Sequence, residues 1–157
     1  MPEAQDADAL VGALLESCCA QVLEAMFFSP VLGPAEPAEC RGRPRVAALL
    51  HFNGKPSGNL EVDADPGVAR ALASSFLGLD LSDVSDSQVD EVIAEFANMT
   101  CGSALSSLGR VEYFHLETPV VSRPLAYAPA VEGVRRGFLL DGGTLSVCLR
   151  VEFGPEE

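Results

Sequence analysis

Basic residues are scarce in this sequence. Its 157 residues include 10 Lys and Arg against 23 Asp and Glu, which gives a formal net charge of −13. Apart from Arg41, Arg43, Arg45 and the pair Arg135 and Arg136, the cations are scattered along the chain. Because binding to a phosphate backbone needs concentrated positive charge, nucleic acid is not expected as a partner.

Signals for secretion or membrane insertion are also lacking. The N-terminal segment begins with acidic residues and carries Glu16 within its apolar part, a pattern that is wrong for a secretory signal. No apolar run reaches the roughly 20 residues that a membrane-spanning helix needs. We therefore expect a cytoplasmic protein with no membrane partner.

Cysteines with the spacing of metal ligands are missing as well. Five cysteines stand at positions 18, 19, 40, 101 and 148, an odd count without a CxxC motif. This pattern supports neither a disulfide framework nor a structural metal. We expect Cys18, Cys101 and Cys148 to be buried thiols in a reducing cytoplasm, and no cofactor or metal ion bound by this chain.

What the sequence does have is enough apolar material for a sizeable core. Hydrophobic residues make up 48% of the chain and charged residues 21%, a composition typical of one globular domain over residues 1–157. Within it, residues 29–44 are rich in proline and contain two glycines. Because proline disrupts both helices and central strands, this segment is predicted to be a surface loop without regular structure.

The hydrophobic pattern predicts helices and strands in a mixed order. A first helix is expected from Asp6 or Asp8 to about Phe28, and a shorter one over residues 66–77. The residues predicted to pack in the first helix are Val11, Leu15, Cys18, Val22 and Met26. The strand candidates are residues 46–52, 60–64, 111–116, 119–122, 138–140 and 144–153.

Two turns join neighbouring strand candidates. Residues 53–58, NGKPSG, join the first two candidates, and their Asn53-Gly54 step favours positive φ, so a hairpin is predicted there. A second hairpin is predicted to turn over residues 141–143. Helices followed by antiparallel strands favour an α+β fold, with long helices packed on a largely antiparallel β-sheet.

Residues 85–108 are the longest strongly periodic segment, and a helix is predicted there. Ser85 or Ser87 is the expected cap at its start. At about 100° per residue, one side of this helix is apolar and expected to pack: Val89, Val92, Ile93, Phe96, Thr100 and Ala104. The opposite, displayed side consists of Glu91, Glu95, Asn98 and Gly102.

The displayed side is unfavourable for helix stability. With no Lys or Arg in this segment, Glu91 and Glu95 repel each other slightly at a spacing of four residues. Asn98 is a poor helix former, and Gly102 costs about 1 kcal/mol relative to Ala. Such penalties on one stripe favour a functional surface. On pattern alone an ordinary exposed face stays equally possible, with Gly102 allowing another element of the chain to approach closely.

One family shares these features. The segment EFAN at residues 95–98, a helical E-x-x-N followed by Gly102, stands with TPVV at 118–121 and VLEAMF at 22–27. In this combination the sequence resembles the CheX branch of the CheC/CheX/FliY chemotaxis phosphatases. The resemblance implies an α/β fold with long helices over a sheet. CheX proteins carry one such site per chain and are homodimers, whereas CheC proteins tend to carry two, so this sequence fits the one-site branch.

The resemblance also implies a reaction and a partner. Family members hydrolyse the aspartyl phosphate of the response regulator CheY, whose receiver domain supplies its own Mg²⁺. Asn98 would position the attacking water and Glu95 would pair with the receiver's lysine, so these two are the expected catalytic residues. Glu91 and Gly102 would contact the partner. The sequence departs from the family at Glu91, where Asp or Ser is frequent.

A homodimer is implied too, and the last strand offers a way to form it. Its apolar residues alternate, as an edge strand that pairs with a second chain would require. These residues are Leu145, Val147, Leu149 and Val151.

Besides the phosphatase, the sequence leaves a second and a third function open. The chain could be a non-catalytic module that binds a response regulator or a flagellar switch component, an interpretation that Glu91 leaves open and the intact Asn98 argues against. It could also be an unrelated hydrolase that uses Glu91 and Glu95 as an acid and base pair. That third function is the weakest, because two glutamates on an exposed helix lack a pocket that would separate their pKa values.

Overall fold

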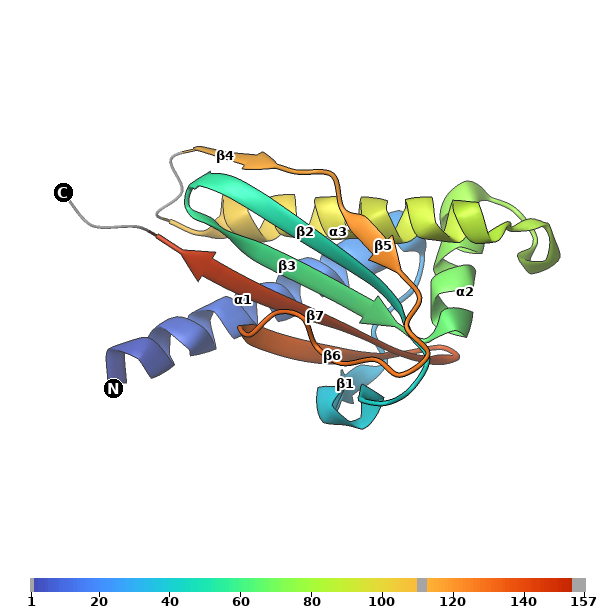
Figure 1. The fold of residues 1–157 in the computed structure, drawn as a ribbon, viewed down its shortest axis with the longest axis horizontal. Helices are drawn as coiled ribbons and strands as arrows, with labels where there is room; N and C mark the ends of the chain where they lie inside the picture. Colours follow the sequence, from blue (N-terminus) through green and yellow to red (C-terminus); the bar gives the residue numbers. More distant parts are fainter. Residues whose placement is uncertain (1, 110–112, 154–157) are drawn as a thin grey trace.

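The chain folds into three helices packed on one side of a mostly antiparallel sheet (Figure 1). The computed structural model describes residues 2–109 and 113–153, with side chains described from residue 6 onward. The helices are α1 (Pro2–Phe27), α2 (Pro66–Leu77) and α3 (Asp86–Ser107), with short 3-10 helices η1 (Pro37–Cys40) and η2 (Leu81–Asp83). The predicted α+β fold is confirmed.

Seven strands form the sheet in the order β1-β6-β7-β3-β2-β4, and β5 also pairs with β2. Their bounds are β1 Gly33–Ala35, β2 Val46–Lys55, β3 Ser57–Ala64, β4 Tyr113–Leu116, β5 Val120–Ser122, β6 Val134–Leu140 and β7 Gly143–Glu152. Each strand pairing among the described residues is antiparallel. The predicted β6–β7 hairpin is confirmed by the pairing of Leu140 with Gly143.

Alternation along the central strands gives the sheet two different faces. In β3, Leu60, Val62 and Ala64 belong to the buried cluster that also contains residues of all three helices. The intervening Glu61 and Asp63 are buried as well, although they are charged. Because successive strand side chains point to opposite faces, these carboxylates lie on the face away from the helices.

Local sequence signals define the ends of α2 and α3. Asp65 precedes Pro66 at the start of α2, and Gly78 ends it in the left-handed conformation with φ 69°. Ser85 caps α3 by accepting a hydrogen bond from the Gln88 N–H, and the Gln88 side chain bonds back to the Ser85 N–H. Both predicted helices are therefore confirmed.

The first helix differs from its prediction in two ways. It begins at Pro2 rather than near Asp6 or Asp8. Met26, predicted to pack, is 45% exposed, whereas Leu15, Cys18 and Val22 are buried as expected. Among the described residues, one segment, Asp6–Phe27 of α1, is long and apolar enough to cross a membrane by length and composition alone, although no apolar run of that length was expected. A core helix passes the same test, and the buried residues of α1 belong to the core cluster.

The hairpin predicted between residues 46–52 and 60–64 is confirmed, because β2 and β3 pair antiparallel, but its turn does not lie at Asn53-Gly54. β2 continues through this step, and Asn53 and Gly54 pair with His115 and Phe114 of β4. The connection to β3 instead lies at Pro56, between the ends of the two strands. Gly54 has a φ of 139°, and an added Cβ would lie 2.4 Å from the Tyr113 carbonyl oxygen. The absence of a side chain at Gly54 therefore allows β4 to pair closely with β2.

The proline-rich segment 29–44 is more regular than predicted. It contains β1, which pairs with β6, and η1, whose Cys40 is buried. The proline positions are compatible with an edge strand and with the first turn of a short helix, so the expectation of no regular structure is wrong.

The C-terminal strands also alter the expected route to a dimer. β7 pairs with β3 on one side and β6 on the other, so it is an interior strand and cannot pair with a second chain. Leu145, Val147 and Leu149 of β7 are buried in the core under the helices. Of the predicted strand at 111–116, β4 covers Tyr113–Leu116, and residues 111 and 112 lie outside the described part of the chain.

The end of α1 has an unusual backbone. Phe28, directly after the helix, has a φ of 54°, and the Ser29 N–H donates to the Leu23 carbonyl oxygen at 2.9 Å. This bond is typical of a Schellman helix end, in which the residue in the left-handed conformation is usually glycine. Here that residue is Phe28. A bulky residue there costs about 1 kcal/mol or more. The side chain of Phe28 nevertheless is exposed.

A network of buried charges covers the sheet face opposite the helices. Arg45 donates to Asp63 at 2.8 Å and pairs with Asp65 at 2.9 Å. Arg135 joins Glu61 at 2.6 Å and Asp63 at 3.1 Å. The side chains of Arg45 and Asp63 are fully buried, so the low polarity around them strengthens each interaction and makes an unpaired charge costly.

The same network holds the loop of residues 123–133 against the sheet. The Tyr127 hydroxyl donates to Glu61 at 2.8 Å, and the Ala130 N–H donates to the other Glu61 oxygen at 3.0 Å. Burial raises the pKa of the Tyr127 phenol above its ordinary value, with a further contribution from nearby Asp63, so the hydroxyl remains a donor. Glu61 thus has both oxygens occupied by this loop and Arg135.

Replacing Arg45 by Met should lower the free energy of unfolding by about 3–5 kcal/mol, because it leaves Asp63 buried with one fewer cation. Urea denaturation measures the change. The matched control is Arg150→Met, which removes an arginine from an exposed pair with Glu152 and should cost less than about 1 kcal/mol. Equal losses in the two variants would contradict a special role for the buried network.

Candidate functional site

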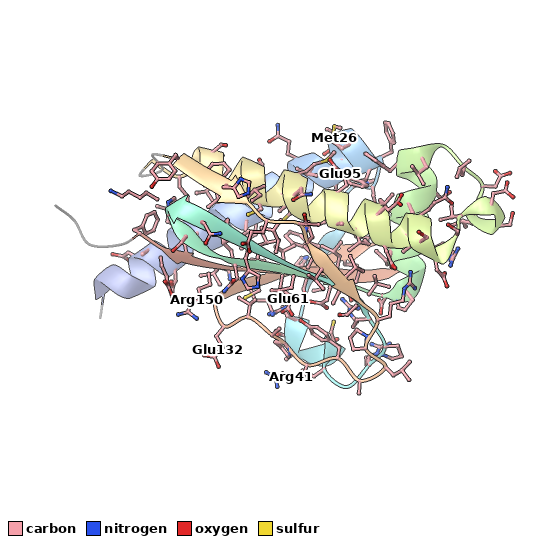
Figure 2. All side chains as sticks on the ribbon, turned by 45° about the horizontal axis from the view of Figure 1, so that its top comes forward. Met26, Arg41, Glu61, Glu95, Glu132 and Arg150 are labelled. Atoms are coloured by element: carbon pink, nitrogen blue, oxygen red, sulfur yellow. The ribbon has the colours of Figure 1, made fainter. Side chains whose placement is uncertain are left out.

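The helix α3 is held along one side and exposed along the other. The residues predicted to pack are all buried: Val89, Val92, Ile93, Phe96, Thr100 and Ala104. On the opposite side Glu91 and Glu95 are exposed, while Asn98 and Gly102 are half-buried. The predicted division of the helix into a packed and a displayed side is therefore confirmed. Figure 2 shows Glu95 on the outer surface of the helical layer.

The four displayed residues, Glu91, Glu95, Asn98 and Gly102, are named the α3 face below. They extend over residues 91–102, which corresponds to a strip about 16 Å long at 1.5 Å of rise per residue. Their spacing of four, three and four residues places them on one side of α3. A strip of this length suits contact with the surface of another protein.

The carboxylates of α3 fall into two groups. Asp86 pairs with Arg70 of α2 at 2.5 Å, and Asp90 pairs with Arg123, which follows β5, at 2.7 Å. Arg123 also donates to the Asp86 carbonyl oxygen at 3.0 Å. These pairs join α3 to its neighbours. Sequence reasoning missed them, since neither arginine has a local spacing that relates it to α3.

Glu91 and Glu95 form the second group, because neither has an ion pair or hydrogen bond among the described residues. Arg45 and Arg135 belong to the buried charge network, and Arg70 and Arg123 pair with the aspartates of α3. None of these four arginines pairs with Glu91 or Glu95. Their negative charge is uncompensated within the described part of the chain and available to a cationic group of a partner.

The Asn98 side chain has no hydrogen bond to any residue in the described ranges 2–109 and 113–153. Its amide can donate two hydrogen bonds and also accept. Gly102 is open as well, since an added Cβ would meet nothing within 4 Å. No element in the described part of the chain therefore approaches Gly102 closely, which does not support the alternative that this glycine admits one.

The C-terminal end of α1 borders the α3 face. The ring of Phe27 meets that of Phe96, the residue after Glu95, edge to face with centroids 5.5 Å apart. In Figure 2, Met26 and Glu95 lie near each other on the helical side of the molecule. The sequence pattern placed Met26 in the packed stripe of α1, because its spacing continues that stripe. In the structure Met26 is exposed at the end of the helix.

Other chemistries have less support in the structure. Glu91 and Glu95 are not among the residues that line the cavities near β2, β3, β6 and β7, so an acid and base pair in a pocket is not formed there. All five cysteines are free and buried, as predicted for Cys18, Cys101 and Cys148. Burial raises the pKa of the Cys101 thiol to about 12, which disfavours the nucleophilic thiolate. Within the described residues, no group of three or more His, Cys, Asp or Glu could hold a metal ion.

Comparison with known families and structures gives a consistent match. The family model described as chemotaxis phosphatase CheX matches residues 46–139, which extend from β2 to β6 and include all of α3. A chemotaxis protein CheX from Vibrio vulnificus has a similar structure, with 21% identity and a TM-score of 0.72 over 88% of this chain and 93% of that one.

Two further structures extend the comparison. CheX from Borrelia burgdorferi, in a complex with CheY, BeF3 and Mg²⁺, has 19% identity and a TM-score of 0.64 over 89% of this chain and 96% of that chain. FliY from Thermotoga maritima has 16% identity and a TM-score of 0.62 over 94% and 90%. At these identities the likeness shows a shared fold. The comparison with curated proteins gives no significant match.

Proposed function

Because the chain belongs to the CheX family of chemotaxis phosphatases, we propose that it hydrolyses the aspartyl phosphate of a CheY-type receiver domain. The observation that carries the proposal is the α3 face, where Glu95 and Asn98 are unpaired within the described chain and lie inside the matched segment. A solved relative bound to CheY supports the choice of partner. Chemotaxis signalling would place the protein in the cytoplasm.

The reaction needs little covalent chemistry from this chain. A water oxygen forms a new bond to phosphorus, the bond from phosphorus to the receiver's aspartate oxygen breaks, and inorganic phosphate and a free carboxylate result. The receiver would supply the Mg²⁺ that stabilises charge on the phosphoryl oxygens. What remains for this protein is to hold the water in line.

Asn98 suits that positioning role. Its amide oxygen can accept a hydrogen bond from the water while its NH₂ donates to a phosphoryl oxygen. Because no described residue occupies the amide, no internal bond has to break before it acts. The preceding turn of α3 fixes its backbone through buried Phe96 and Ala97.

Glu95 would anchor the complex by pairing with the receiver's active-site lysine, a charge-assisted contact that needs an unpaired carboxylate. Glu91, one turn earlier, would add negative charge to the same surface. Gly102 would let the receiver approach the helix closely, since no side chain projects from that position. In this arrangement Glu95 is not required as a general base.

The chain is also proposed to form a homodimer, and one sheet edge that could pair with a second chain lies at β4 and β5. Both strands pair with β2 on one side and have no other strand partner among the described residues. Tyr113 of β4 and Val120 of β5 are exposed apolar residues at this edge. An unpaired edge can add strands from a second chain.

Asn98→Ala should reduce dephosphorylation at saturating receiver by about 10²-fold or more, to near the receiver's own spontaneous rate. The fold should persist, because Ala is the better helix former by several tenths of a kcal/mol. Single-turnover decay of the phosphorylated receiver measures the rate, and a titration measures affinity, which should change little.

The control is Ser106→Ala, which removes an exposed hydroxyl from the same helix. With this variant the phosphorylated receiver should lose its phosphate at the wild-type rate. If Asn98→Ala matches the wild type, Asn98 has no part in the mechanism. A wild type that binds the receiver without accelerating decay would instead favour a non-catalytic binding module.

Glu95→Lys should weaken binding of the receiver by at least about tenfold, since it replaces an attractive contact with a repulsive one. Glu95→Ala should weaken it less, and its turnover should recover in part at high receiver concentration. Glu132→Lys makes the same charge change far from α3 (Figure 2) and should have little effect. Normal binding with lost turnover in Glu95→Ala would contradict the anchoring role.

Sedimentation at tens of micromolar protein should show a dimer, a concentration suited to ordinary weak-dimer affinities of about micromolar. Val120→Lys should raise the monomer fraction, because a charge at the β5 edge opposes strand pairing. Leu81→Lys, on η2 between the helices, serves as the control. A monomeric wild type would contradict the proposed dimer.

A further inference from the structure

Two exposed apolar residues stand at the end of α1, next to the α3 face. Met26 is 45% exposed and Phe28 is 72% exposed, while Phe27 between them is fully buried. We refer to Met26 and Phe28 as the α1 shoulder. Nothing in the mechanism proposed above uses them.

Phe27 fixes the position of this shoulder. Its ring stacks on Phe76 of α2 with centroids 4.9 Å apart and meets Phe96 of α3 at 5.5 Å. Because Phe96 follows Glu95, the end of α1 is held against the turn of α3 that carries the proposed anchoring residue. Figure 2 shows Met26 and Glu95 on the same side of the molecule.

Phe28 is a poor residue for its own position. Its φ of 54° is in the left-handed region, where glycine is favoured and a bulky side chain is strained. The Ser29 N–H bond to the Leu23 carbonyl closes the helix end and requires only the backbone. The ring contributes little to the core, because most of it is exposed. Neither helix capping nor packing therefore accounts for a phenylalanine here.

We propose that the α1 shoulder binds an apolar patch of the receiver domain beside its phosphorylation site, while Glu95 pairs with a cation of the same receiver. This inference rests on the proposed function for its partner. The argument for that partner is continuity: the buried Phe27–Phe96 contact holds the end of α1 against α3, and Met26 lies near Glu95 in Figure 2, so one protein would cover both. Buried apolar side chains next to a charged contact are a common source of interface affinity.

Phe28→Gly tests the inference, because a role in stability and a role in binding predict different results. The glycine fits the left-handed backbone, so the melting temperature should rise by about a few degrees. The dissociation constant for the receiver should nevertheless increase about tenfold, as expected for losing an aromatic anchor. The probe is a CheY-type receiver from the same genome, titrated with and without phosphorylation by a small acyl phosphate.

Two further variants complete the experiment. Met26→Ala should raise the dissociation constant in the same direction with little change in melting temperature. Leu125→Gly removes a side chain that is 82% exposed in the 123–133 loop, and should leave the dissociation constant unchanged. Decay of the phosphorylated receiver at saturating Phe28→Gly should equal that of the wild type, because Asn98 is intact.

Unchanged affinity in both Phe28→Gly and Met26→Ala would overturn the inference. Loss of the dimer in Phe28→Gly with unchanged receiver affinity would also overturn it, and would show that a second copy of the chain covers the shoulder. The proposed phosphatase activity fails separately, if the wild type binds the receiver without accelerating decay. In that case the dissociation constants of the Phe28 and Met26 variants still decide whether the α1 shoulder binds the receiver.

Discussion

The structure depends on a sheet whose second face is partly buried although it carries charges. The helices cover the apolar face, and the other bears Glu61 and Asp63, which are almost completely removed from water. Such charges are tolerated only when paired, and Arg45 and Arg135 provide the partners. The 123–133 loop is attached through this network, and the proline-rich segment is attached in turn by pairing with β6 and by backbone hydrogen bonds to that loop.

The sequence predicted the parts of the fold that are determined by neighbouring residues. The capping box of Ser85 and Gln88, the Gly78 helix end and the β6–β7 hairpin arise from signals within a few positions. Prediction failed where a distant strand decided the outcome. Asn53-Gly54 is a favourable turn step by itself, but pairing with β4 keeps it extended.

Much the same distinction applies to the candidate site. The α3 face was found from periodicity, because an amphipathic helix shows which residues are displayed. Periodicity does not show which displayed carboxylates are already neutralised. Arg70 and Arg123 are far from Asp86 and Asp90 in the sequence, and only the packing of α2 and β5 beside α3 pairs them. The neutralised aspartates and the unpaired glutamates became distinguishable only in the structure.

That distinction has an evolutionary consequence. Asp86 and Asp90 hold α3 to the rest of the molecule, whereas Glu91, Glu95 and Asn98 make no described internal bond. Under the proposed function, selection for stability acts on one set of residues and selection for partner recognition on the other. Descendants of this chain would then alter specificity, or lose the proposed activity, by drift at a few surface codons while the scaffold persists.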